Sequence, residues 1–176
     1  MKYSAHLFLA SALLVGGWFA APKASAQEGG ARTSEGFARN SIFLELLGNG
    51  IAYSLNYDHK IFNHLSARIG GMYAPWNDQN SDQNLTFVVV PVMANYLLGN
   101  GSSRLEVGAG VSYSYASGNL NRIDDFTGGS VTAFTSTLGY RLQPTDGGFL
   151  FRIGFTPTFF KQGMLPLVGL SLGGTF

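Results

Sequence analysis

The segment from Arg104 to Tyr115, RLEVGAGVSYSY, alternates strictly between two kinds of side chain. Successive side chains of a β-strand point to opposite faces, so one face of this strand is apolar and ends in Tyr113 and Tyr115. The other face is small and polar, rich in glycine and serine, and carries one carboxylate, Glu106. An apolar outer face with an aromatic end and a small, polar inner face are typical of a transmembrane β-barrel strand.

The composition fits a chain that exposes much of its surface to lipid. Hydrophobic residues make up 45% of the 176 residues and charged residues only 12%, against about 25% charged in ordinary soluble domains. No segment after residue 26 approaches the roughly 18 consecutive apolar residues that a membrane-spanning helix needs. The length favours one domain, which is either a β-barrel or an unusually apolar soluble β-protein.

Residues 1–26 have the three parts of a secretory signal peptide. Lys2 supplies the positive charge, Leu7–Ala21 the apolar core, and Ala24–Ala26 the small-residue cleavage site. The apolar run is short and broken by two glycines, which favours cleavage over a retained membrane anchor. We expect the mature chain to begin at Gln27.

Cleavage changes the charge balance, and the absence of cysteine narrows the chemistry. Loss of Lys2 and Lys23 leaves nine basic against ten acidic residues, a net charge of −1, so there is no basic excess for binding nucleic acid. A chain without cysteine has no disulfide, no thiolate nucleophile or metal ligand, and no acylated N-terminal cysteine. Export then ends in the periplasm, outside the cell, or in an outer membrane.

The mature chain divides into a loose periplasmic tail at 27–40 and a barrel at 41–176. The barrel region contains eight segments with period-two alternation, separated by turn residues. These segments are Ser41–Leu47, Ala52–Lys60, Leu65–Tyr73, Leu85–Leu98, Arg104–Tyr115, Ser130–Arg141, Phe149–Thr156 and Leu167–Phe176. Most approach the roughly 9–11 residues of a tilted membrane strand. The predicted fold is all-β, an eight-stranded antiparallel transmembrane up-and-down β-barrel.

The connections between these segments alternate between short turns and longer loops, as they do in membrane barrels. Asn49-Gly50 predicts a very short turn where a long loop is usual. The longer loops are expected at Trp76–Asn84, Ala116–Gly129 and Pro157–Pro166. Pro91 cannot donate a ladder hydrogen bond, so we expect a bulge there, and the facing of the fourth segment stays open.

The chain stops on Phe176, directly after the alternating segment LVGLSLGGT. A terminal aromatic residue resembles the signal read by the outer-membrane barrel-assembly machinery, although Gly174 stands where a second aromatic is frequent. The whole mature chain resembles the small OmpA/OmpX-type barrels. The motifs NSIFLELLGNG, YSLNYDHK and GYRLQPTDGGFLFRIGFTP resemble outer-membrane β-barrel domain proteins of Bacteroidetes-type bacteria. This resemblance implies a fold and a location in the outer membrane, but no reaction, because that family shares no catalytic residues.

Five charged residues fall on the inner faces of the predicted strands. They are Glu45, Arg68, Glu106, Arg141 and Arg152. Ions inside a narrow barrel must be paired or hydrated, and two carboxylates with three guanidiniums can form a bidentate network. Such a network either fills and locks the barrel or gates an ion path. Eight strands leave room for little more than side chains, which favours locking. Whether Arg141 or Arg152 pairs with Glu106 is open.

The remaining candidates do not form a reactive site. His59 and His64 flank the turn after the second segment, where solvated side chains are expected, and a metal would need more than the adjacent Asp58. Barrel enzymes that modify lipid A use a His and a Ser with an acid, or similar groups, near the external rim, and neither of these histidines lies at that end. We therefore expect no catalytic, cofactor-binding or metal-binding residues. The tyrosines and Trp76 are interpreted as girdles at the membrane interfaces.

These observations lead to one interpretation and two alternatives. The interpretation is a monomeric outer-membrane barrel with a packed polar lumen and a structural or surface-interaction role, without catalysis. Its expected partners are outer-membrane lipids, the assembly machinery during biogenesis, and an external ligand that the sequence does not name. The first alternative is a small pore or a carrier of hydrophobic molecules, and the second is an enzyme that modifies lipid A.

Overall fold

The computed structural model describes residues 38–78, 83–119 and 128–176. All of them belong to one compact unit that begins at Glu35. The signal peptide and nearly all of the expected tail lie outside the described residues, as do segments 79–82 and 120–127. No helix in the described part of the chain is long and apolar enough to cross a membrane.

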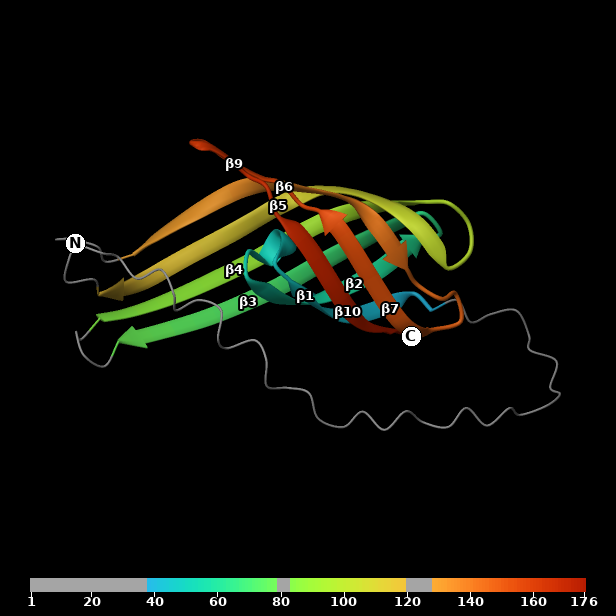
Figure 1. Cartoon of the computed structure of the whole chain (residues 1–176), viewed down its shortest axis with the longest axis horizontal. Coiled ribbons are helices and arrows are strands. Elements are labelled where there is room, and N and C mark those ends of the chain that lie inside the picture. Colours follow the sequence, from blue (N-terminus) through green and yellow to red (C-terminus); the bar gives the residue numbers. More distant parts are fainter. Residues whose placement is uncertain (1–37, 79–82, 120–127) are drawn as a thin grey trace, which may run out of the picture. The chain divides into compact units, whose positions relative to one another are not determined.

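Eight strands form a closed antiparallel barrel (Figure 1). They are β1 (Asn40–Leu46), β2 (Tyr53–Phe62), β3 (Leu65–Asp78), β4 (Gln83–Leu98), β5 (Ser103–Asn119), β6 (Gly129–Leu142), β7 (Gly148–Phe155) and β10 (Val168–Thr175). Neighbours in the barrel follow the order β5-β4-β3-β2-β1-β10-β7-β6, and a β5–β6 pairing closes it. The structure confirms the predicted fold class.

The faces of the strands follow the predicted alternation. On β1, Ile42 and Leu44 are exposed on the outside while Phe43 and Glu45 are buried inside. Large exposed apolar side chains occur on every barrel strand, and most of the buried side chains are polar. This distribution inverts that of a soluble protein, in which polar groups face the solvent, and it gives the barrel an outer surface suited to lipid.

The two ends of the barrel differ. One end carries Ala38, Phe176 and the short β2–β3, β4–β5 and β6–β7 turns, and we call it the terminal end. The opposite end, called the far end, carries a 3-10 turn at Gly48–Gly50 between β1 and β2 and a small hairpin between β7 and β10. That hairpin consists of β8 (Thr158–Phe160) and β9 (Gly163–Leu165), and β8 pairs with β6.

Four adjacent strands are longer than the rest and project past them at the far end (Figure 1). Strands β3 to β6 have 14, 16, 17 and 14 residues, whereas β1, β2, β7 and β10 have 7, 10, 8 and 8. Pairing continues to Asp78–Gln83 and Ala116–Gly129. The prediction of loops at Trp76–Asn84 and Ala116–Gly129 is therefore wrong for the first and last residues of each range, which belong to strands. Backbone pairing continues there after the apolar alternation ends.

The fourth strand passes Pro91 without the expected bulge. Pro91 pairs in register with Ser112 on β5, and the pairs Ile69–Val92 and Met72–Val89 on the β3 side keep one register. The proline ring points inward beside Gly70, where an added Cβ would lie 3.0 Å from its Cγ. A glycine in the neighbouring strand makes room for the ring, so the strand stays regular and its facing is decided.

The turn at Asn49-Gly50 is as short as predicted, and it folds into the barrel, with positive φ angles at Leu47 and Ile51. Two further expectations change in detail. The expected loop at Pro157–Pro166 contains the β8–β9 hairpin. The barrel also begins before residue 41: β1 starts at Asn40, and Ala38 N–H donates to the Thr145 carbonyl at 2.9 Å.

Candidate functional site

The predicted charged residues all lie buried in the lumen. Glu45 comes from β1, Arg68 from β3, Glu106 from β5, Arg141 from β6 and Arg152 from β7. Each lies on the inner face of its strand, because it is separated from the buried residues of that strand by an even number of positions. The structure brings all five into one connected cluster and adds members that the sequence interpretation did not include.

Glu106 is bound by Arg152 through two parallel hydrogen bonds. Arg152 Nε donates to Oε2 at 2.8 Å, and Nη2 donates to Oε1 at 2.7 Å. The nearest Arg141 nitrogen lies 3.8 Å from Glu106 Oε1. The forked geometry matches a guanidinium to a carboxylate, so Arg152 is the principal partner and Arg141 is a secondary one.

Arg141 instead binds Asp58, which was not among the five charged residues predicted for the cluster. Arg141 Nη2 lies 2.8 Å from Oδ1 and Nη1 lies 3.3 Å from Oδ2. Ser66 Oγ donates to the same carboxylate at 2.9 Å. The alternation of β2 contained the signal for this role, because Asp58 shares the inner face with Ser54 and Asn56.

Glu45 links the remaining arginines. Arg68 Nη1 lies 3.3 Å from Glu45 Oε1, and Arg152 Nη1 lies 3.8 Å from the same oxygen. Both guanidiniums also stand near the ring of Phe43, with Arg152 Cζ at 4.7 Å and Arg68 Cζ at 5.8 Å from its centroid. An aromatic face attracts a cation, so Phe43 helps to stabilise both guanidinium groups inside the lumen.

The inward turn closes this cluster at the far end. Asn49 Oδ1 accepts from Arg68 Nη2 at 2.6 Å and from Thr137 Oγ1 at 3.1 Å. Its Nδ2 donates to Thr135 Oγ1 at 2.6 Å. Sequence reasoning missed this role, because Asn-Gly signals a tight turn but not the direction in which the turn folds.

The result is a balanced chain of charges along the lumen. Three carboxylates alternate with three guanidiniums, in the order Arg68, Glu45, Arg152, Glu106, Arg141 and Asp58. Each contact joins opposite charges and offsets part of the cost of removing them from water. The arrangement is suited to locking the barrel walls together and to obstructing the lumen.

The histidines lie away from this cluster, at the terminal end. His59 Nδ1 contacts Asn40 Oδ1 at 2.8 Å, and His64 Nδ1 contacts the Leu97 carbonyl at 2.9 Å. Within the described residues, no three His, Cys, Asp or Glu side chains are grouped to hold a metal ion. Phe176 also lies at this end, exposed, with its backbone paired to Asn40.

A closed eight-stranded antiparallel barrel, apolar outside and charged inside, is the architecture of the small outer-membrane β-barrel proteins. The N-terminal barrel domain of Pseudomonas aeruginosa OprF is similar, with a TM-score of 0.58 and 17% identity over 78% of this chain and 96% of that one. Ail, the attachment invasion locus protein of Yersinia pestis, was solved with the heparin analogue sucrose octasulfate. It is similar with a TM-score of 0.54 and 14% identity, over 78% of this chain and 98% of Ail.

Neither a protein-family model nor a curated protein sequence matches the chain. The structural likeness, at these low identities, shows the fold alone: this chain has the closed eight-stranded antiparallel β-barrel fold of these two proteins. The closer likeness to the Bacteroidetes-type proteins stays a prediction from the sequence motifs.

Proposed function

We propose that this protein is exported by residues 1–26 and resides in the outer membrane, where it has a structural or surface-interaction role without catalysis. The exposed apolar side chains around the barrel support the membrane location, because a soluble monomer rarely exposes so large an apolar surface. The outer-membrane origin of the similar barrels supports the choice of membrane.

The ion pairs buried in the lumen support a role other than conduction. Three carboxylates and three guanidiniums pair there, and Asn49 connects the inward turn at the far end to Arg68, Thr135 and Thr137. An ion crossing the lumen would have to displace several buried charge-assisted hydrogen bonds.

The projecting sheet of β3 to β6 is the single observation that carries the surface-interaction role. Its inner face continues past the lumen and carries apolar side chains in positions cross-strand from one another, the Trp76–Leu85 and Ala74–Phe87 pairs. Trp76 is 46% exposed, and it shares the parity of the inward Met72, so it is not the outward girdle residue that the sequence indicated. Ail, named for attachment, supports this class of role for a barrel of this fold.

The first experiment tests the barrel and the closed lumen. The purified protein is folded in detergent, run unboiled and boiled on a denaturing gel, and inserted into planar bilayers. We expect a mobility shift on boiling, β-type circular dichroism and no discrete conductance steps. Regular conductance steps would favour the pore alternative, and a helical spectrum would contradict the barrel.

The second experiment tests the surface role on cells. Attachment to heparin and to immobilised matrix proteins is compared for cells with the protein, without it, and with a Trp76→Ser, Phe87→Ser variant. The matched control is Tyr73→Ser with Val88→Ser, a cross-strand pair on the outer face of the same sheet. We expect attachment to fall only in the inner-face variant. Equal attachment with and without the protein would contradict the surface-interaction role and leave only the structural role. The masses of lipid A from the same cells are measured in parallel, and a change that depends on the protein would favour the enzyme alternative.

A further inference from the structure

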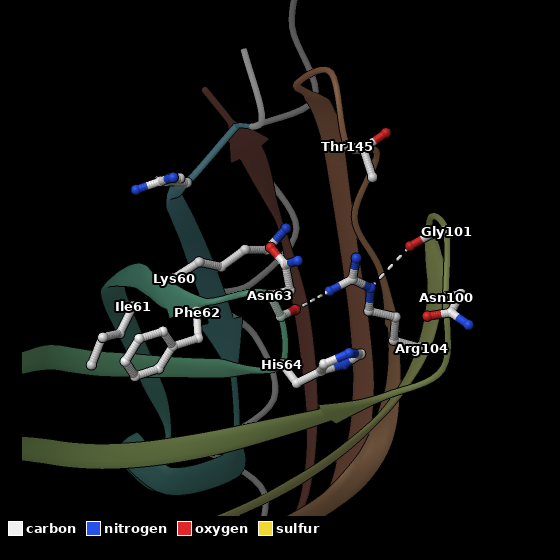
Figure 2. A pocket seen from close by; sticks show the side chains of 10 residues that line it. Lys60, Ile61, Phe62, Asn63, His64, Asn100, Gly101, Arg104 and Thr145 are labelled. Carbon is white, nitrogen blue, oxygen red and sulfur yellow. Dashed lines mark hydrogen bonds between the residues drawn. The ribbon is translucent and has the colours of Figure 1, made fainter. Parts of the chain in front are cut away.

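A pocket of about 210 Å³ opens at the terminal end of the barrel, away from the ion pairs of the lumen (Figure 2). Its wall comes from the end of β2, the β2–β3 and β4–β5 turns and the start of β5, with Thr145 from the β6–β7 turn. The volume is several times the roughly 30 Å³ that one water molecule occupies in the liquid. The pocket can therefore hold a small polar group.

The described residues that line the pocket carry positive charge without a matching negative charge. Arg39, Lys60 and Arg104 contribute to its wall, and no Asp or Glu is among the described residues that line it. The closest acidic residue on β2 is Asp58, whose carboxylate is bound by Arg141 and Ser66. This carboxylate therefore pairs with an arginine of the lumen and not with the positive groups of the pocket.

Lys60 is the most informative residue of this wall. The residue as a whole is only 7% exposed, and its ammonium group, which has no hydrogen-bond or ion-pair partner among the described residues, keeps contact with solvent in the pocket. The like charge of Arg104 opposes the positive charge of Lys60. Figure 2 shows Lys60 and Arg104 entering the pocket from opposite sides, so an anion between them would compensate both.

Arg104 is held in place by neutral acceptors. Its Nε donates to the Gly101 carbonyl at 2.9 Å, and Nη1 donates to the Asn63 carbonyl at 2.7 Å. These bonds fix the plane of the guanidinium but leave its full positive charge uncompensated. A pre-oriented guanidinium beside an ammonium is suited to a phosphate group, which accepts from both.

An apolar groove joins this pocket on the outer surface. The groove has about 680 Å³ and is lined by Ile61, Phe62, Leu65 and Tyr96, next to Arg39 and His64. Phe62 is 69% exposed. His64 stacks on Tyr96 with ring centroids 6.0 Å apart, which gives the groove a firm wall. The pocket and the groove share Arg39, Ile61, Phe62, Asn63 and His64.

We infer that this pocket binds the phosphate group of an anionic phospholipid, whose acyl chain lies in the adjoining apolar groove. The positive pocket accounts for the phosphate, and the exposed Phe62 and Tyr96 account for the chain. The inference rests on the proposed membrane location and adds to it a defined lipid site in the leaflet at the terminal end. Such a site would anchor the barrel at a fixed depth.

The test uses the full mature chain folded in detergent, whose mobility shift on boiling is measured first. Binding of phosphatidylglycerol, of diacylglycerol with the same acyl chains, and of inorganic phosphate is then followed by native mass spectrometry. We expect phosphatidylglycerol to bind more tightly than either of the other two, because only it has both the phosphate and the chains. Equal retention of the two lipids would overturn the inference. Inorganic phosphate that binds as tightly as the lipid would overturn the lipid assignment.

Three variants separate the parts of the site. Lys60→Gln with Arg104→Gln is expected to weaken phosphatidylglycerol binding by about ten-fold or more. Phe62→Ser is expected to weaken lipid binding without changing phosphate binding. Lys161→Gln removes one exposed positive charge from the hairpin at the far end and is expected to change neither. If Lys60→Gln alone, which spares the Arg104 contacts, binds the lipid like the wild type, the inference is wrong. A chain that forms no heat-modifiable barrel would contradict the proposed function instead.

Discussion

Arg152 on β7 and Glu106 on β5 form a bidentate ion pair across the intervening strand β6. Gly139 on β6 pairs with Glu106 on one side and with Gly154 on the other. An added Cβ at Gly139 would lie 2.6 Å from the Cα of Gly154, which is too close for any side chain. Glycine at this inward position therefore lets β6 and β7 approach each other beside the ion pair.

Removing one partner of this pair should destabilise the barrel. Glu106→Ala leaves the guanidinium of Arg152 buried without its main partner, which costs about 3–5 kcal/mol for a fully buried pair. The free energy of unfolding, measured by urea titration in lipid, is expected to fall accordingly. The double variant Glu106→Leu, Arg152→Met removes both charges and should recover part of the loss. A Glu106→Ala barrel as stable as the wild type would contradict the ion-pair cluster.

Asn49 should hold the inward turn in the lumen. Asn49→Ala removes the acceptor for Arg68 and Thr137 and the donor to Thr135, which costs about 1–3 kcal/mol per buried group left unsatisfied. We expect lower resistance to urea and the first appearance of brief conductance events in bilayers. Asn100→Ala, in the exposed β4–β5 turn, is the control and should behave like the wild type. Unchanged stability in both variants would mean that the turn does not depend on its lumen contacts.

The outer face should be sensitive to charge according to depth. Ile69 is exposed on the outer face within β3, whereas Leu105 lies two residues from the terminal end of β5. An arginine near the midplane costs about 2–4 kcal/mol, and one near the interface about 0–1 kcal/mol. Urea titration in lipid vesicles should therefore rank Ile69→Arg below Leu105→Arg in stability. Equal and negligible losses would contradict the assignment of this face to lipid.

Two variants of Phe176 can distinguish a role as an assembly signal from a role as a structural contact. Its N–H donates to the Asn40 carbonyl at 2.8 Å and its carbonyl accepts from Asn40 N–H at 2.9 Å. Phe176→Ala keeps both backbone bonds, whereas deletion of Phe176 removes them. If the aromatic ring is the signal, both variants should show reduced surface levels in cells while Phe176→Ala still folds normally in detergent. Normal surface levels of Phe176→Ala would show that the ring is not read.

The sequence predicted the facing of the strands well and the contacts inside the barrel poorly. Period-two alternation placed Glu45, Arg68 and Glu106 on the inner face because each strand position has one of two faces. It did not identify the partner of Glu106, since that depends on the register of β5, β6 and β7. The alternation of β2 gives Asp58 an inward position, but its partner Arg141 lies 83 positions away in the sequence.

The sequence likewise predicted the middle of each strand better than its ends. Apolar alternation marks only the part of a strand that faces lipid, so the extensions of β3 to β6 were taken for loops. Backbone pairing, which does not require apolar side chains, continues to Asp78 and Asn119. The regular passage of β4 at Pro91 likewise depends on Gly70 in the adjacent strand.

The sequence by itself determined the class of fold and the two faces of the barrel, because alternation is a local property of each strand. Only the tertiary structure decided how the charges pair, that Asn49 folds inward, and that Lys60 and Arg104 share a pocket. These features arise from registers between strands and from the closure of the sheet. Closure brings residues far apart in the chain to within a few ångströms, and no local pattern encodes those distances.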